Sequence, residues 1–206
     1  MSSIEITAVD QANAEKVFAL VTDVFSGGST LHRALGIGLE EYRAYLHDGF
    51  MAMVVEGLSV VAVEDGDLLG CMIVTDFHQH LGVSEAPDRF APLAALTGEL
   101  CRQYQQVRNI GPGEAALVDM GAVSSRAGGK GVYQKLRDAA QDRARQRGFR
   151  RIVGELSSAA TQHVVLNRLG HEKLAEVRFA DFEFGGAKPF AGIGEPESII
   201  LAEGLL

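Results

Sequence analysis

The sequence predicts one mixed α/β domain, with a central sheet of about six to seven strands flanked by helices. Strand-like apolar runs alternate with segments of helical period along the 206 residues. The sequence contains no internal repeat, low-complexity tract or interdomain linker. A chain of this length can bury a proper core without metals or disulfides, and domains of roughly 100–200 residues are usual. We therefore treat residues 1–206 as a single domain.

The first half of the chain predicts three strands and three helices. Residues 4–9 alternate like a strand, and Asp10 is a suitable helix cap. The Asp65-Gly66-Asp67 turn between two apolar runs is a strong hairpin signal. Glycines interrupt residues 25–38, and residues 78–87 have the composition of a loop. The expected strands cover about 4–9, 58–63 and 68–75, and the expected helices about 12–22, 39–47 and 88–107.

The second half begins with a turn at 109–113 and a strand at 115–123. The longest predicted helix covers 129–147 and ends at Gly148, a typical glycine after a helix. Its apolar residues share one helical face and are Val132, Leu136, Ala139, Ala140 and Ala144. The remaining predictions are strands at about 151–156, 173–184 and 198–202, a helix at about 159–169, and a Gly/Pro-rich loop at 185–196.

Composition excludes several classes of protein. With 47% hydrophobic and 22% charged residues the chain is expected to be globular, and its net charge of −8 argues against general nucleic-acid binding. A helix needs about 20 apolar residues to cross a bilayer, and no apolar stretch of this sequence approaches that length. The sequence also shows no secretory signal, so we expect a cytoplasmic protein without membrane contact. Cys71 and Cys101 lie far apart and predict buried thiols rather than a disulfide framework or zinc ribbon.

The charge is unevenly distributed. Residues 126–151 contain nine basic and two acidic side chains, a net +7 that leaves −15 for the rest of the chain. A solvated helix face is the usual explanation for such a run. Because Gly128, Gly129 and Gly131 open the same segment, a phosphate-rich ligand on the long helix is the alternative.

A glycine-rich turn from a strand into a helix presents free backbone N–H groups and the positive end of the helix dipole to a phosphate. A Walker A loop is excluded, because Gly131 follows Lys130 where Ser or Thr would be needed. A dinucleotide fingerprint is disfavoured, because this turn lies past the middle of the chain. A coenzyme A loop needs neither magnesium nor a ribose-binding acid, and glycines that only turn the chain remain the structural alternative.

The segment 122–136, AVSSRAGGKGVYQKL, followed by a basic helix, resembles motif A of the GNAT acetyltransferase superfamily. The later LNRLG at 166–170 resembles the motif B helix of that family, and the element order matches over nearly the whole chain. Residues 179–190 and the glycine-broken segment 25–36 resemble arylalkylamine or dopamine N-acetyltransferase-like members. The resemblance implies a GNAT fold and acetyl-CoA as the cosubstrate.

Two registers align this chain with the family's [QR]-x-x-G-x-[GA] motif. In the first register, literal matching of the motif begins at Arg126. In the second register, the phase of the helix places Gly128 at the first motif position and Tyr133 at the last, where the family has a small residue, and we prefer this second register. In either register, the resemblance implies that backbone amides of the turn bind the coenzyme pyrophosphate and that the main chain at the end of the strand meets the pantetheine arm. The residues implied are Ala122, Val123, Gly128, Gly129, Lys130 and Gly131.

Amine acetylation requires a base, an oxyanion donor and an acid for the thiolate. The family's usual glutamate base and motif B tyrosine are replaced here by the Ser29 segment and Leu166. Asp119 is our preferred base: it lies four residues before Val123, and we expect it on the same strand face. A carboxylate in a buried strand otherwise needs an arginine or a backbone N–H as partner.

Other polar residues are secondary candidates. His78 and His80 would relay protons, pair on a metal or lie in a solvated loop, and the sequence offers no third metal ligand. Glu155 is a candidate for binding an amine or for a surface ion pair, and His32 is an alternative base. Ser158 and Thr161 lie at the start of the motif B helix, and the resemblance implies a catalytic role for Ser158, although helix capping alone would explain this serine.

We therefore expect an acetyl-CoA-dependent N-acetyltransferase whose substrate is a small-molecule amine. Direct attack in a ternary complex is expected, because the sequence places no histidine near Cys71 or Cys101. The alternatives are a GNAT-fold module that binds acyl-CoA as a sensor or partner-binding subunit, and a nucleotide-binding regulator. We expect no nucleic-acid partner, and the late strands give a weak indication of a homodimer.

Overall fold

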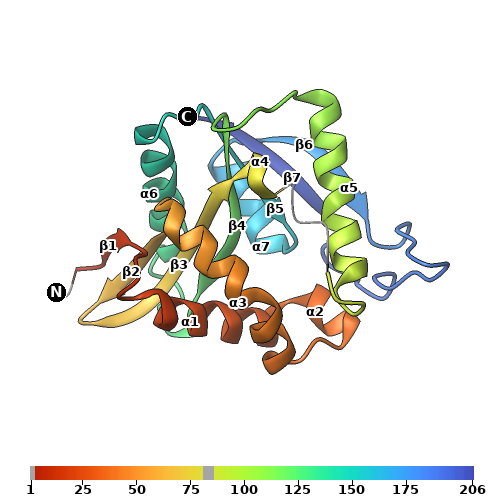
Figure 1. Cartoon of the computed structure of the whole chain (residues 1–206), viewed down its shortest axis with the longest axis horizontal. Helices are drawn as coiled ribbons and strands as arrows, with labels where there is room; N and C mark the ends of the chain where they lie inside the picture. The colour runs from red at the N-terminus through yellow and green to blue at the C-terminus, as the bar shows by residue number, and fades with distance from the viewer. Residues whose placement is uncertain (1–2, 81–85) are drawn as a thin grey trace.

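The computed structural model describes residues 3–80 and 86–206. These residues form a seven-stranded sheet in the order β1-β2-β3-β4-β5-β7-β6 (Figure 1). The β4–β5 pair is parallel and the other described pairs are antiparallel, which confirms the predicted mixed sheet. The strands are β1 (Glu5–Ala8), β2 (Val60–Glu64), β3 (Asp67–Asp76), β4 (Ala115–Val123), β5 (Arg151–Leu156), β6 (Glu172–Arg178) and β7 (Ser198–Leu205).

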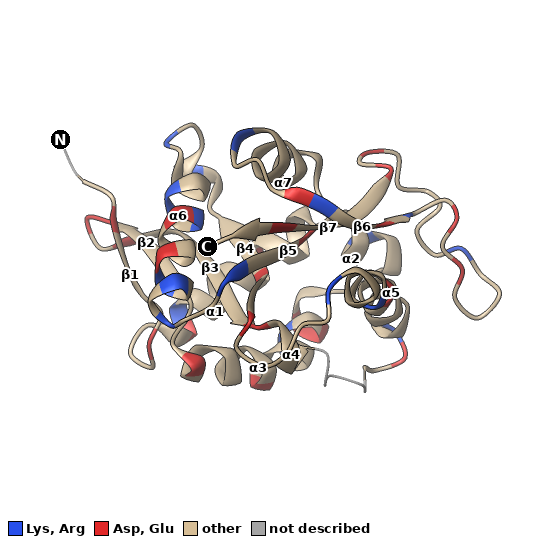
Figure 2. Cartoon of the chain, turned by 90° about the horizontal axis from the view of Figure 1, so that it is seen from above, with Lys and Arg blue, Asp and Glu red and all other residues tan. Residues whose placement is uncertain are grey.

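Helices cover both faces of this sheet, and Figure 2 shows α5 and α7 on opposite sides. Alternation along β4 explains the two cores, since Leu117 packs with α5 while Ala116 and Val118 pack with α6. The helices are α1 (Ala14–Gly28), α2 (Thr30–Leu35), α3 (Leu39–Glu56), α4 (Phe77–His80), α5 (Ala91–Val107), η1 (Ser125–Ala127), α6 (Val132–Gln146), α7 (Ala159–Gln162) and η2 (His163–Arg168).

Two N-terminal helices are longer than predicted. Helix α1 continues through Gly27 and Gly28 because Val24 and Phe25 extend its apolar face into the core, while both glycines are exposed. Helix α3 continues past residue 47 because Phe50 and Val54 are buried against the sheet. In both helices tertiary packing outweighs the low helix propensity of glycine.

Several boundaries in the rest of the chain also differ from the prediction. Residues 77–80 form a short helix where a loop was expected, and 81–85 of that predicted loop lie outside the described residues. Helix α6 starts at Val132 because Gly129 and Gly131 adopt left-handed φ values of 77° and 67°. Strand β6 ends at Arg178 because the following aromatic residues turn back and pack on one another.

The predicted β2–β3 hairpin is confirmed. Asp65 and Gly66 have φ values of 52° and 86°, the positive pair that a tight two-residue hairpin requires. None of the helices in the described part of the chain is both long enough and apolar enough to cross a membrane.

Candidate functional site

Strands β4 and β5 stop pairing in the middle of the sheet. Their parallel register runs from Ala115–Arg151 to Val118–Gly154, yet β4 continues to Val123 and β5 to Leu156. Among the described residues, the 119–123 edge of β4 has no strand partner on the β5 side. Its main-chain polar groups can therefore pair with an extended ligand, as an added strand would.

Asp119 is located where the two strands part. On its other side, Ile73 of β3 pairs with Met120 and Val74 pairs with Val118, so Asp119 is the extra residue of a β-bulge. Bulges redirect side chains and are frequent beside active sites. Asp119 thus follows the last β4–β5 pair and has no register partner on β3.

The bulge makes our prediction for the face of Asp119 wrong. Val123 packs with the α6 core, and a Cβ on Gly121 would meet the Tyr133 ring of α6 at 3.1 Å. Asp119 instead contacts His80 of α4, on the opposite side of the sheet. The extra residue reverses the alternation of side chains that the prediction assumed.

Four polar side chains from four elements converge at this point. His80 Nδ1 lies 3.5 Å from Asp119 Oδ1, and His80 Nε2 lies 3.7 Å from Glu155 Oε1. The Cys101 thiol of α5 donates to Glu155 Oε1 at 3.5 Å. The side chains of His80, Asp119 and Glu155 are 24%, 18% and 12% exposed, and Cys101 is buried. We call these four residues the His80 cluster.

The His80 cluster corrects two expectations. Cys101 does have a histidine nearby, and His80 does have further metal-ligand atoms, since those of His80, Cys101 and Glu155 lie within 4.8 Å of one another. His78 is exposed and lies outside the cluster. Because the four residues come from distant parts of the sequence, only the strand order brings them together.

Burial controls protonation in the His80 cluster. Loss of solvent is the main reason that the pKa of Glu155 is raised to about 7; His80 opposes this shift, the charge of Asp119 adds to it, and the Cys101 hydrogen bond opposes it. Burial also raises the pKa of Asp119, and His80 opposes that shift. The pKa of the Cys101 thiol is raised by burial and then by Glu155, which keeps it protonated. The cluster therefore contains a carboxylate that exchanges a proton near neutral pH and a thiol that is a poor nucleophile.

Aromatic residues of α3 lie near Asp119. Burial raises the pKa of both Tyr42 and Tyr45, and the charge of Asp119 adds to each shift. The Tyr45 ring stacks on Phe90 with centroids 4.1 Å apart, and the Tyr42 hydroxyl donates to Met120 Sδ at 3.7 Å. Nothing in the sequence connects α3 with β4, so this aromatic neighbourhood could not be predicted.

The glycine turn continues from the end of β4 into α6. Residues 128–131 are exposed, and a Cβ on Gly129 or Gly131 would meet no atom within 4 Å. The first backbone N–H groups of α6 have no partner inside the helix, as at every helix N-terminus. The predicted cofactor residues, Ala122, Val123 and 128–131, thus lie along one continuous path from the free β4 edge to the start of α6.

No protein-family model matches the sequence, and no curated protein is significantly similar to it. Solved structures do match. The C-terminal condensation domain of Ebony in complex with beta-alanyl-dopamine aligns over 100% of both chains at 15% identity with a TM-score of 0.86. The Drosophila melanogaster polyamine N-acetyltransferase that forms N-acetylagmatine aligns over 99% of this chain and 100% of its own, with 18% identity and a TM-score of 0.82.

Arylalkylamine N-acetyltransferase 2 from Aedes aegypti aligns over 98% of this chain and 99% of its own, at 16% identity and a TM-score of 0.80. The chain has the GNAT fold. The NatC complex bound to Gag peptide and CoA also matches, with 16% identity, 99% coverage of both chains and a TM-score of 0.57. Neighbours of this fold therefore include N-acetyltransferases and a structure that contains CoA.

The residues that the sequence comparison places at the expected acid and base positions serve other contacts. The Ser29 hydroxyl caps α2 by accepting the His32 backbone N–H. His32 is buried, its ring lies 4.4 Å from that of Tyr42, and burial lowers its pKa to about 4. A histidine with so low a pKa is a weak base at neutral pH.

Ser158 is exposed and caps α7, where its hydroxyl accepts the Thr161 N–H at 3.2 Å. Among the described residues no hydrogen bond joins Ser158 to the His80 cluster. Its position is fully explained by capping, and its predicted catalytic role stays a prediction.

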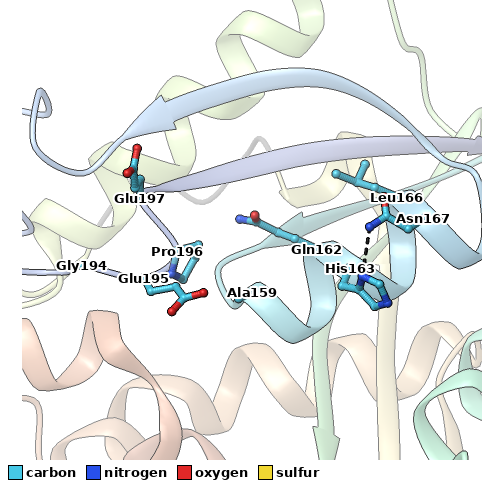
Figure 3. A pocket seen from close by; sticks show the side chains of 9 residues that line it. All are labelled: Ala159, Gln162, His163, Leu166, Asn167, Gly194, Glu195, Pro196 and Glu197. Carbon is cyan, nitrogen blue, oxygen red and sulfur yellow. Dashed lines mark hydrogen bonds between the residues drawn. The ribbon is translucent and has the colours of Figure 1, made fainter.

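Leu166 lines a pocket between α7–η2 and the loop before β7 (Figure 3). Gln162 anchors one wall, because its amide donates to the carbonyls of Leu156 and Ser198 at 3.0 and 2.9 Å. None of the pocket's lining residues belongs to the His80 cluster. The lining residues are Ala159, Gln162, His163, Leu166, Asn167, Gly194, Glu195, Pro196 and Glu197.

Much of the basic segment contacts the protein itself. Arg143 and Arg147 donate to the carbonyls of Gly57 and Glu56 at the end of α3, and Lys130 pairs with Glu64. These contacts satisfy helix-terminal carbonyls and anchor the glycine turn to β2. The +7 charge of the segment therefore acts only in part toward solvent or a ligand.

Arg137 of the basic segment is buried in the protein, and its burial was not predicted from the sequence. It is fully buried in α6, and its guanidinium nitrogens have no hydrogen-bond partner within the described ranges. Burial lowers its pKa, and a Cβ on Gly154 would lie 3.3 Å from its Nη1. The spacing of Tyr133, Arg137 and Ala144, four and seven residues apart, is the signal that could have placed it on the inner face.

Proposed function

We propose that this chain is an acetyl-CoA-dependent N-acetyltransferase that acts on the primary amine of a small molecule by direct transfer. The observation that carries the proposal is the location of the Asp119–Glu155 pair, at the point where β4 leaves β5. That point lies at the inner end of the path formed by the free β4 edge and the glycine turn.

The residues on the donor path fit acetyl-CoA. In the glycine turn the N–H groups of Gly128 and Lys130 donate to the carbonyls of Ser125 and Ala127, so the turn offers a pyrophosphate mainly those of Gly129 and Gly131, in an open cradle. The free β4 edge offers main-chain groups to the amides of pantetheine. Bound acetyl-CoA would supply the thioester carbonyl that the amine attacks. This chain contributes the N–H donors, the orientation and a site from which solvent is largely excluded.

The acceptor side fits an ammonium ion. Asp119 and Glu155 are two largely buried carboxylates, and His80 is their ion-pair partner among the described residues. An ammonium group between them would be bound by charge and then lose a proton to Glu155, whose pKa is about 7. As the new N–C bond forms and the C–S bond breaks, the proton held by the cluster can pass to the thiolate.

The neighbouring aromatic residues favour an aromatic amine as the acceptor. Tyr42 and Tyr45 lie near enough for the charge of Asp119 to raise the pKa of each hydroxyl. An arylalkylamine would direct its ammonium to Asp119 and Glu155 and pack its ring beside α3. The matched Aedes aegypti arylalkylamine N-acetyltransferase supports this choice of acceptor class.

The alternative is a GNAT-fold module that binds acyl-CoA with little turnover. Ser29 and Leu166 favour it, because both are committed to structural contacts at positions where the family usually has catalytic groups. Both hypotheses share the donor path and differ only in the use of the carboxylate pair.

Kinetics of Asp119→Ala separate the two hypotheses. The substrates are acetyl-CoA with a panel of arylalkylamines and polyamines, and the readouts are amide product and donor affinity. We expect product from the parent protein and a loss of kcat of roughly 10²–10⁴-fold in the variant with donor affinity unchanged. Donor binding by the parent with no product from any amine would instead establish the binding module.

A further inference from the structure

We propose that His80, Cys101 and Glu155 form a binding site for a soft divalent metal ion such as Zn²⁺. One nitrogen, one sulfur and one carboxylate oxygen lie within 4.8 Å of one another on α4, α5 and β5. This combination of donors suits zinc and its neighbours and does not suit magnesium or calcium, which prefer oxygen alone.

The two donor–donor distances that involve Glu155 fit one tetrahedral ion. Typical bonds to zinc from sulfur, nitrogen and oxygen place a sulfur–oxygen pair about 3.6 Å apart and a nitrogen–oxygen pair about 3.4 Å apart. The observed separations are 3.5 Å for Cys101 Sγ to Glu155 Oε1 and 3.7 Å for His80 Nε2 to the same oxygen. The third pair, His80 and Cys101, lies within 4.8 Å, so binding would bring these two side chains toward a separation of about 3.6 Å.

Asp119 supplies the outer partner that such sites usually contain. Its Oδ1 lies 3.5 Å from His80 Nδ1, the ring nitrogen turned away from Glu155. A carboxylate in this position fixes the orientation of the ring and leaves Nε2 free to bind the metal. Three protein ligands also leave a fourth coordination position open, as in catalytic zinc sites.

Charge also favours a cation at this point. Two carboxylates and a thiol are gathered around one histidine, and among the described residues no arginine or lysine forms an ion pair with Asp119 or Glu155. Metal binding would release the Cys101 proton to solvent, so the apparent affinity rises with pH. If the proposed acetyltransferase function holds, the metal competes with the ammonium group of the acceptor.

Titration of the purified full chain with Co²⁺ tests the site directly. We expect one ion per chain and the near-ultraviolet charge-transfer absorption of a cobalt–thiolate bond. Cys101→Ser should remove that absorption, and His80→Ala should weaken binding more than tenfold. Asp119→Asn should weaken it about 10–100-fold, as changes to outer partners of metal ligands do.

The chain offers a matched control for the cysteine ligand and for the histidine ligand. Cys71→Ser removes the other buried thiol, on β3, and His78→Ala removes an exposed histidine of the same short helix. Both variants should bind as the parent does, and thermal unfolding of every variant checks that it folds. Absence of the thiolate absorption in the parent, its survival in Cys101→Ser, or an unchanged Co²⁺ affinity in His80→Ala would overturn the site.

The outcomes separate this site from the proposed function. Co²⁺ binding by a parent protein that acetylates no amine would leave the metal site standing and overturn the enzyme. Acetyl transfer by a parent protein that lacks the thiolate absorption would support the enzyme and overturn the metal site. Inhibition of transfer by Zn²⁺ that a higher amine concentration relieves would support both.

Discussion

Two carboxylates on adjacent strands, the largely buried Glu155 and the buried Glu203, have opposite surroundings. Glu203 of β7 accepts hydrogen bonds from Tyr104 at 2.6 Å, Arg108 at 3.2 Å and Arg151 at 2.9 Å. Glu155 of β5 faces His80 at 3.7 Å and the Cys101 thiol at 3.5 Å. Both lie under helix α5, which contributes Tyr104 to one and Cys101 to the other.

The comparison shows how one sheet holds a structural and a reactive carboxylate. Two arginines compensate the charge of Glu203, which locks α5 and the start of β5 to β7. Burial without such a partner instead raises the pKa of Glu155 to about 7. A carboxylate that releases and regains its proton near neutral pH is suited to proton transfer, whereas one held by two arginines is suited to stability.

Of the variants that test this comparison, Glu155→Gln gives the largest expected effect on activity, equal to that of Asp119→Ala. The amide keeps the shape of the side chain but cannot take a proton, so we expect kcat to fall by roughly 10²–10⁴-fold. Stability should be unchanged or higher, because a buried charge is removed. Steady-state kinetics and urea unfolding measure the two effects, and an unchanged kcat would exclude Glu155 as the base.

Glu203→Gln should show the opposite pattern. Removing one member of a buried ionic network leaves Arg108 and Arg151 without their partner, and we expect a loss of up to about 3 kcal/mol in unfolding free energy, the low end for buried pairs because both arginines retain solvent contact. The kcat of the folded fraction should stay near that of the parent. Equal stability of variant and parent in urea would contradict the structural role of Glu203.

The pH dependence sharpens the comparison. Glu155 has a pKa of about 7 in the folded protein against an ordinary 4.5, so between these values the folded state holds a proton that the unfolded chain has released. Folding stability should therefore fall as pH rises from about 4.5 to about 7, while kcat/KM rises about tenfold per pH unit below the pKa. Both slopes should disappear in Glu155→Gln and persist in Glu203→Gln.

Gly129→Ala gives the smallest expected effect and tests the donor path alone. The left-handed φ of 77° should lower the free energy of unfolding of the alanine variant by about 1 kcal/mol. Distortion of the turn should raise the KM for acetyl-CoA about tenfold, which is the effect expected from the loss of one hydrogen bond to a charged group. The kcat should be unchanged. Gly98→Ala on the exposed side of α5 is the matched control, with stability equal or higher and KM unaffected.

The sequence predicted the element order because each strand is a short apolar run and the longest helix shows its period clearly. Residues 115–123 and 151–156 coincide with β4 and β5. Helix ends were less predictable, since Gly27 and Gly28 are retained in α1 by packing that no local pattern reveals. The glycine turn was visible in the sequence because the left-handed backbone at residues 129 and 131 favours glycine.

The candidate site was only partly predictable. Asp119 attracted attention as a charge in an apolar strand, but its face depends on a bulge defined by its pairing with β3. Cys101 and His80 gave no sign of being neighbours, because strand order alone places α4 and α5 beside β4 and β5. Arg137 was hidden in a basic segment, although its helical spacing marks the inner face.

Thermal unfolding of the parent protein with acetyl-CoA tests the central claim most directly, because the donor path is common to the enzyme and the binding module. A ligand at 100 times its dissociation constant adds about 2.7 kcal/mol to the free energy of unfolding. We predict this stabilisation with acetyl-CoA, and none with ATP or NAD at the same concentration. No shift at millimolar acetyl-CoA, or an equal shift with ATP or NAD, would contradict the account.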